Sequence, residues 1–140
     1  MRPVMKGRTL GKLTGEVAME ERLSYQNVVQ ELLLAVPEFI GAQLSEAEAF
    51  PDVQLDFFYS FVDAQYENGL STEASLSKRI IAFIDRMSLY VNDEPLREAL
   101  YWCIIGPAIH ENRRFGAVLE SRLSEQGLEQ MQIVRSLINA

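Results

Sequence analysis

A chain of 140 residues can bury one substantial hydrophobic core, so we expect a single domain that folds without disulfides or a structural metal. The 13 basic and 20 acidic residues give a net charge of −7, which disfavours nucleic-acid binding by the body of the protein. One histidine and one cysteine cannot supply the paired ligands of most zinc sites or an internal disulfide, and no run approaches the roughly 20 apolar residues that cross a membrane. We therefore expect a cytoplasmic protein that needs no cofactor, holds no metal and spans no membrane.

Residues 1–18 differ from the rest of the chain in charge and in pattern. They carry four basic residues against Glu16 and contain three glycines, and no hydrophobic period runs through them. This composition predicts a flexible basic arm, which either lies outside the native fold or touches an acidic partner. Residues 19–140 carry nine basic and nineteen acidic residues, a net charge of −10. We expect residues 19–140 to form the single helical domain, and Met19 is a candidate for the true translation start.

Helical periodicity begins at Ser24, which can cap a first helix that Pro37 ends. Pro37 can also serve as an early residue of a second, shorter helix, and Pro51 marks the next boundary. A third helix is expected over residues 53–68, with Gly69 suited to end it in a left-handed conformation. The second helix would carry three apolar side chains, Phe39, Ile40 and Leu44.

The next segment predicts two helices joined by a tight turn. A fourth helix should open at Ser71 or Thr72 and reach Val91, because its apolar side chains fall in one broad stripe. In the turn that follows, Asp93 can cap the next helix and Pro95 suits its first turn.

The fifth predicted helix, residues 96–105, is apolar on nearly every side, and such a helix belongs at the centre of a bundle. Gly106 and Pro107 come directly after it and are expected to bend or break it. Two further helices are predicted near residues 115–123 and 128–138, and no segment alternates with the period of a strand. The sequence therefore predicts an all-α fold, a compact bundle of six or seven helices. The apolar stripe of the last helix comprises four residues, Met131, Val134, Leu137 and Ile138.

The third predicted helix presents more than a core stripe. Asp56, Asp63 and Glu67 form an acidic ridge within about 40° of one another on the helix. Phe57 and Phe61 point in a different direction. One interpretation is a solvated face whose aromatic pair packs on a neighbouring helix. The other is an interaction edge, in which the rings supply buried area and the carboxylates steer a basic partner protein.

The fifth helix contributes a second candidate site. Tyr101 and Trp102, with His110 just beyond the Gly-Pro pair, are candidates to line a small-molecule pocket between helices. Cys103 lies on the side of this helix that we expect to be buried, so it is predicted to be a small hydrophobic residue and no nucleophile. A lone histidine is more typical of a helix end or a surface than of catalysis. No catalytic residue is predicted.

The stretch of residues 76–109 resembles one HEAT-like helical hairpin. Such hairpins stack into protein-binding surfaces, so the resemblance implies a hairpin at the centre of the bundle. The features that carry it are the helix with Lys78-Arg79-Ile80-Ile81-Ala82-Phe83-Ile84, the turn Asn92-Asp93-Glu94, and the residues Ala99, Leu100 and Ile104.

Three further segments carry a broader likeness: Glu31-Leu32-Leu33, Pro37-Glu38-Phe39 and the run from Arg79 to Asp85. Over residues 24–138 the chain resembles a family of small all-helical bacterial proteins of unknown function. Some members are similar to immunity proteins that neutralise secreted toxins. The resemblance implies a binding role and brings no catalytic residues to this chain.

Together these patterns favour a non-enzymatic protein-binding module. Its most concrete form is an immunity or inhibitor protein that blocks a basic partner through the acidic and aromatic edge of the third helix. One alternative is a small-molecule-binding regulatory bundle with its pocket at the fifth helix. Another is a self-associating structural subunit, whose exposed apolar points would be Leu34, Leu89 and the pair Phe57 and Phe61.

Overall fold

The computed structural model describes residues 22–41 and 50–139. The predicted basic arm, Met19 and Leu44 lie outside these residues. Within them every regular element is helical and no strand occurs, so the all-α prediction is confirmed. The elements in chain order are α1 (Val28–Ala35), α2 (Pro51–Glu67), α3 (Ser75–Ser88), α4 (Glu94–Ala99), the π-helical segment η2 (Leu100–Ile105), α5 (Gly106–Glu111), α6 (Arg114–Arg122) and α7 (Glu125–Ile138).

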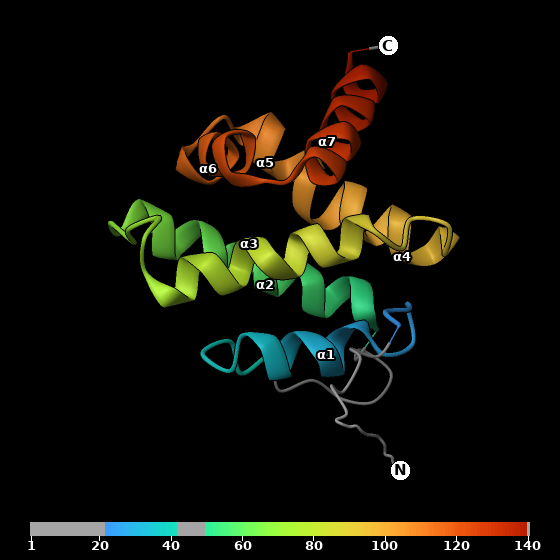
Figure 1. The fold of residues 1–140 in the computed structure, drawn as a ribbon, viewed down its shortest axis with the longest axis horizontal. Helices are drawn as coiled ribbons and strands as arrows, with labels where there is room; N and C mark the ends of the chain where they lie inside the picture. The colour runs from blue at the N-terminus through green and yellow to red at the C-terminus, as the bar shows by residue number, and fades with distance from the viewer. Residues whose placement is uncertain (1–21, 42–49, 140) are drawn as a thin grey trace, which may run out of the picture.

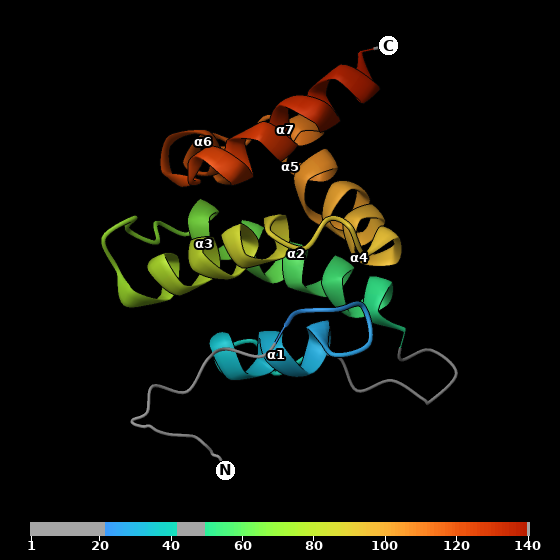
Figure 2. The same cartoon turned by 45° about the vertical axis from the view of Figure 1, so that its right-hand side comes forward.

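The helices pack in three tiers (Figure 1). α1 forms the lowest tier, α2 and α3 cross the middle, and α5, α6 and α7 form the upper tier, an arrangement that is also clear in Figure 2. α4, η2 and α5 make one rising helix that joins the middle tier to the upper one and contacts α2, α3 and α7. No helix among the described residues is long and apolar enough to cross a membrane.

Several predicted boundaries are confirmed. Pro51 is the first residue of α2, and Gly69 follows the end of that helix with φ of 97°. Asp93 caps α4, because its Oδ1 accepts a hydrogen bond from the Leu96 N–H at 3.2 Å. The other oxygen of Asp93 accepts the N–H of Tyr25 at 3.1 Å, which ties the chain ahead of α1 to the start of α4.

Two predicted helix starts are wrong for the same physical reason. α1 begins at Val28, because the side chain of Asn27 accepts the Ser24 N–H at 2.8 Å and holds a turn there. α3 begins at Ser75, because the Ser71 hydroxyl accepts the Glu73 N–H at 3.1 Å in another turn. Side chains of this kind compete with helix formation by bonding to nearby backbone groups.

The short helix predicted after Pro37 is absent from residues 37–41. The Phe39 N–H donates to the Val36 carbonyl at 3.0 Å in a single turn, and Gly41 has φ of 77°. Phe39 enters the core, whereas Ile40 is exposed. The apolar residues that suggested a helix therefore belong to a turn that places one ring inside and one side chain outside.

The helix does not break at Gly106 and Pro107, because it continues from Glu94 to Glu111 with a change of register. The Gly106 N–H donates to the Tyr101 carbonyl, five residues earlier, which is the register of a π-helix. A proline has no N–H, and in an α-helix its ring clashes with the carbonyl four residues before it, here that of Cys103. A wider turn ahead of Pro107 relieves that clash while the helix continues.

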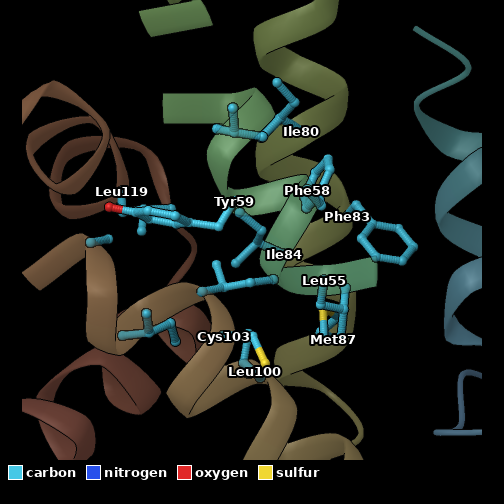
Figure 3. Packing of buried hydrophobic residues seen from close by; sticks show 14 of the residues in the cluster. Leu55, Phe58, Tyr59, Ile80, Phe83, Ile84, Met87, Leu100, Cys103 and Leu119 are labelled. Carbon is cyan, nitrogen blue, oxygen red and sulfur yellow. The ribbon is translucent and has the colours of Figure 1, made fainter. Parts of the chain in front are cut away.

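The core surrounds this central helix. Figure 3 shows side chains from α2, α3, η2 and α6 meeting in one cluster. Two buried hydrogen bonds fix neighbouring helices within it: Tyr66 bonds Ser77 at 2.5 Å between α2 and α3, and Tyr101 donates to Gln130 at 2.5 Å between η2 and α7. Buried polar groups that are paired in this way cost little and specify one packing arrangement. The residues labelled in the figure are Leu55, Phe58, Tyr59, Ile80, Phe83, Ile84, Met87, Leu100, Cys103 and Leu119.

We expect Gly106→Ala to destabilise the fold, although alanine normally favours a helix over glycine by about 1 kcal/mol. An added Cβ would lie 2.8 Å from the Tyr101 carbonyl oxygen and 3.3 Å from a ring carbon of Trp102. Overpacking of this kind costs roughly 1–3 kcal/mol, which urea unfolding would measure. Ser60→Ala on the exposed face of α2 is the control and should change stability by less than about 0.5 kcal/mol. A G106A variant as stable as wild type would contradict the π register.

Candidate functional site

Two of the three residues in the acidic ridge predicted on α2, Asp63 and Glu67, face the corner between α5 and α6. Asn112 ends α5 in a left-handed conformation with φ of 51°, and the chain then turns so that Arg113 reaches α2. The Arg113 guanidinium lies 3.5 Å from Asp63 Oδ2 and 3.6 Å from Glu67 Oε2. Glu67 also accepts the N–H of Arg114 at 3.1 Å. The structure thus brings Asp63 and Glu67 together but joins both to a cation of the same chain.

A third carboxylate, that of Glu111, belongs to the same group. Burial raises the pKa of Asp63 above its usual 3.8; Arg113 opposes this, and the charges of Glu111 and Glu67 add to it. Only 14% of the Asp63 side chain is exposed, and its Oδ1 accepts no hydrogen bond in the described part of the chain. We call Asp63, Glu67 and Glu111 the carboxylate cluster; Arg113 pairs with the first two. Its three acids outnumber this guanidinium.

The remaining residues of the predicted edge lie apart from this cluster. Asp56 is exposed and its charge acts on Cys103 of η2. Phe61 is partly buried, with its ring centroid 5.6 Å from that of Phe39. Phe57 is 47% exposed. In the predicted edge, Asp63 and Glu67 are therefore paired with Arg113. Phe61 packs against Phe39, and Phe57 is half exposed.

The second candidate site is a shallow groove on the upper tier with a volume of about 340 Å³. It brings Trp102 and His110 together, as predicted, but not Tyr101, which is buried with its hydroxyl on Gln130. We call this surface the Trp102 groove. The residues that line it are Trp102, Gly106, Pro107, His110, Glu111 and Ile138.

Trp102 is held firmly although 46% of it is exposed. Its indole N–H donates to Glu98 Oε1 at 3.1 Å, and its ring stands edge-on to that of Tyr101 with centroids 6.4 Å apart. Gly106 has no side chain to crowd the indole ring of Trp102, whereas a Cβ at this position would lie 3.3 Å from the ring. The π turn and Gly106 therefore fix the direction in which Trp102 points.

The other wall of the groove is the end of α7. Met131 and Val134 are buried as the predicted stripe requires, but Leu137 is 50% exposed and Ile138 is 39% exposed. The helix projects beyond the other helices after that point (Figure 2), so the last part of its stripe is only partly covered. The hydrophobic pattern could not reveal this, because it records which side chains share a face and not where the body of the protein ends.

The groove and the carboxylate cluster form one continuous surface. Glu111 lines the groove and its charge acts on Asp63 in the cluster. The surface therefore has an apolar floor around Trp102 and an acidic end at α2. Sequence reasoning named most of its parts but assigned them to two separate sites, because Arg113 and Glu111 join them only in the folded chain.

A second hollow of about 430 Å³ lies between α1 and α3, beside the exposed Leu34. Its charged groups bond within the chain: Arg79 forms two hydrogen bonds with Glu38 at 2.6 and 2.7 Å, and Arg86 bonds Glu31 at 2.9 Å. These ion pairs connect α3 to the lowest tier. Their geometry indicates a structural role for the charges in this hollow.

Cys103 is buried, as predicted, and its sulfur lies 3.6 Å from the Asp52 carbonyl oxygen. Burial, with smaller contributions from Asp56 and Asp52, raises the pKa of this thiol from 9.0 to about 12. The thiolate that would act as a nucleophile is therefore scarce at neutral pH.

No protein-family model matches this chain, and neither a curated protein nor a solved structure matches it. The resemblance to immunity proteins and to a HEAT-like hairpin therefore stays a prediction.

We expect Cys103 in the native protein to react with a disulfide reagent such as Ellman's reagent only as fast as the fold opens. Its raised thiol pKa and its burial both suppress attack. The absorbance of the released thiolate at pH 8 measures the rate, with reduced glutathione as the reference thiol. Immediate stoichiometric reaction of the native protein would contradict the buried position.

The carboxylate cluster predicts a pH dependence of stability. Because the pKa of Asp63 is raised in the folded protein, the folded state binds more protons than the unfolded state between 3.8 and that higher value. This carboxyl therefore lowers the free energy of unfolding as the pH rises through that window. Asp63→Asn removes the effect, so D63N should gain stability relative to wild type as the pH rises above 3.8 through that window.

Urea unfolding of both proteins across this range checks the prediction. A relative stability of D63N that falls with rising pH would mean that Arg113 stabilises the charged form more than burial opposes it.

Proposed function

We propose that this protein is a non-enzymatic protein-binding module whose docking surface is the Trp102 groove together with the carboxylate cluster. The observation that carries the proposal is that Trp102 is half exposed yet fixed by Glu98, Tyr101 and Gly106. Tryptophan is enriched among the residues that dominate binding energy at interfaces. A side chain that is already held in place loses little conformational entropy when a partner covers it.

The charge of the surface supports a basic partner. Asp63 and Glu67 of the carboxylate cluster share the guanidinium of Arg113, Glu111 adds a third negative charge, and the described chain beyond this corner is acidic as well. Acidic groups at the rim of an interface increase the rate of encounter with a cationic protein, and salt weakens this effect. The module would act by covering part of its partner, and an immunity or inhibitor protein is the most concrete form of that role.

The edge of α2 with Asp56, Phe57 and Phe61 stays a second docking candidate. Phe57 supports it, because its exposure of 47% nearly equals the 46% of Trp102. The two surfaces can therefore be compared directly by truncating one ring in each.

A small-molecule regulator is the alternative from another class of function. The groove volume of about 340 Å³ is within the range of ligand pockets, and Trp102 and His110 supply aromatic and polar contacts. If the protein is a regulator, a small molecule should raise its melting temperature in the absence of other proteins. If it is a protein-binding module, only its partner protein should do so.

We expect Trp102→Ala to reduce capture of the partner by roughly tenfold or more, a loss typical of an interface residue that dominates binding. The tagged protein is expressed in its own host, and the material that co-purifies at low and at moderate salt is quantified for wild type, W102A and Phe57→Ala. Stoichiometric partner that is lost in W102A, retained in F57A and released by salt supports the proposal. Loss in F57A with retention in W102A would place docking on the α2 edge.

A further inference from the structure

The walls of the Trp102 groove are themselves helices, and this limits what fits between them. One wall runs from Trp102 to His110, which is roughly 12 Å along a helix axis. The other wall is Ile138, at the end of α7. Two turns of an α-helix measure about 11 Å, so a segment of two or three turns matches the length of the wall from Trp102 to His110.

The backbone N–H and C=O groups of a segment bound in the groove also need hydrogen-bond partners. An extended peptide docks best by adding a strand to the edge of a sheet, and residues 22–41 and 50–139 contain no strand. A helix satisfies its own backbone groups and needs only an apolar surface for its apolar face. Trp102, Pro107 and Ile138 supply that surface.

The acidic end of the groove decides between a second copy of this chain and a different protein. A second copy would bring another Glu111, with its own carboxylate cluster, toward the first, and facing charges of one sign oppose association. A lysine or arginine at the same place would reduce the repulsion among Glu111, Asp63 and Glu67. The surface is therefore complementary to an apolar helix face with basic residues at one end.

We infer that the Trp102 groove binds an amphipathic α-helix of a partner protein, two or three turns long, whose apolar face covers Trp102 and Ile138 and whose basic end lies over Glu111. This inference rests on the proposed function, because it names the part of the partner that docks. In the complex this helix would complete the upper tier beside α5 and α7.

Trp102 is the only tryptophan in the chain, so its fluorescence reports the groove directly. The probe is a synthetic amphipathic helix of leucine and lysine, about 14 residues or four turns long. A peptide with glutamate in place of lysine tests charge, and a scrambled leucine–lysine peptide tests the apolar face. We expect the amphipathic leucine–lysine helix to shift the emission to shorter wavelength with saturation, and to bind at least about tenfold more tightly than either comparison peptide.

Two variants locate the binding. Ile138→Ser removes the α7 side chain that lines the groove and should weaken peptide binding by roughly fivefold or more. Leu89→Ser removes a leucine that is 63% exposed away from the groove and should change nothing. Glu111→Gln should reduce the preference for lysine over glutamate.

Equal affinity for the lysine and glutamate peptides would overturn the charge match, and equal losses in I138S and L89S would mean unspecific adsorption. A shift to shorter wavelength on concentrating the protein alone would identify a second copy as the occupant. If W102A abolishes capture of a partner while no peptide binds, docking at the groove stands and the helix inference fails. If capture is insensitive to W102A, the proposed function fails whatever the peptides do.

Discussion

The fold depends on enclosing one helix, Glu94–Glu111, whose middle residues, 99–109, are all apolar and mostly buried. Burial of apolar area is the dominant favourable contribution to folding, and a helix of this kind gains it only when other helices surround it. α2, α3 and α7 each contact it, while α1 adds a further tier beneath α2 and α3. Asp93 begins this helix and also holds the chain ahead of α1, so its start is fixed by contacts from distant parts of the sequence.

The π register of the central helix connects its packing to the exposed surface. It allows the helix to pass Pro107, and the space above Gly106 accommodates the ring of Trp102. π-helical turns inside α-helices occur frequently at functional sites, because they alter the direction of a few side chains without ending the helix. Here the altered side chains lie beside the projecting end of α7. The π turn that accommodates Pro107 in the helix therefore also shapes the groove that we propose as a docking surface.

The sequence predicted the architecture better than the site. Periodicity found most of the helices, and Asp93 and Gly69 marked boundaries correctly because their effects are local. Local rules failed where a side chain bonded its own backbone, as at Ser71, and where a Gly-Pro pair was accommodated by a change of helical register. The pairing of Arg113 with Asp63 needs the corner between α5 and α6, which no periodicity records. The sequence could name the charged residues but not which of them were already paired.

The most direct test of this account is the hydrogen-bond register at Gly106, because the direction of Trp102 and the shape of the groove both follow from it. Scalar coupling across hydrogen bonds, measured by NMR on labelled protein, identifies the carbonyl that accepts each N–H. The account predicts coupling from the Gly106 nitrogen to the Tyr101 carbonyl carbon. Coupling to the Trp102 carbonyl instead would show a regular α-helix, and would contradict both the π turn and the orientation of the groove that depends on it.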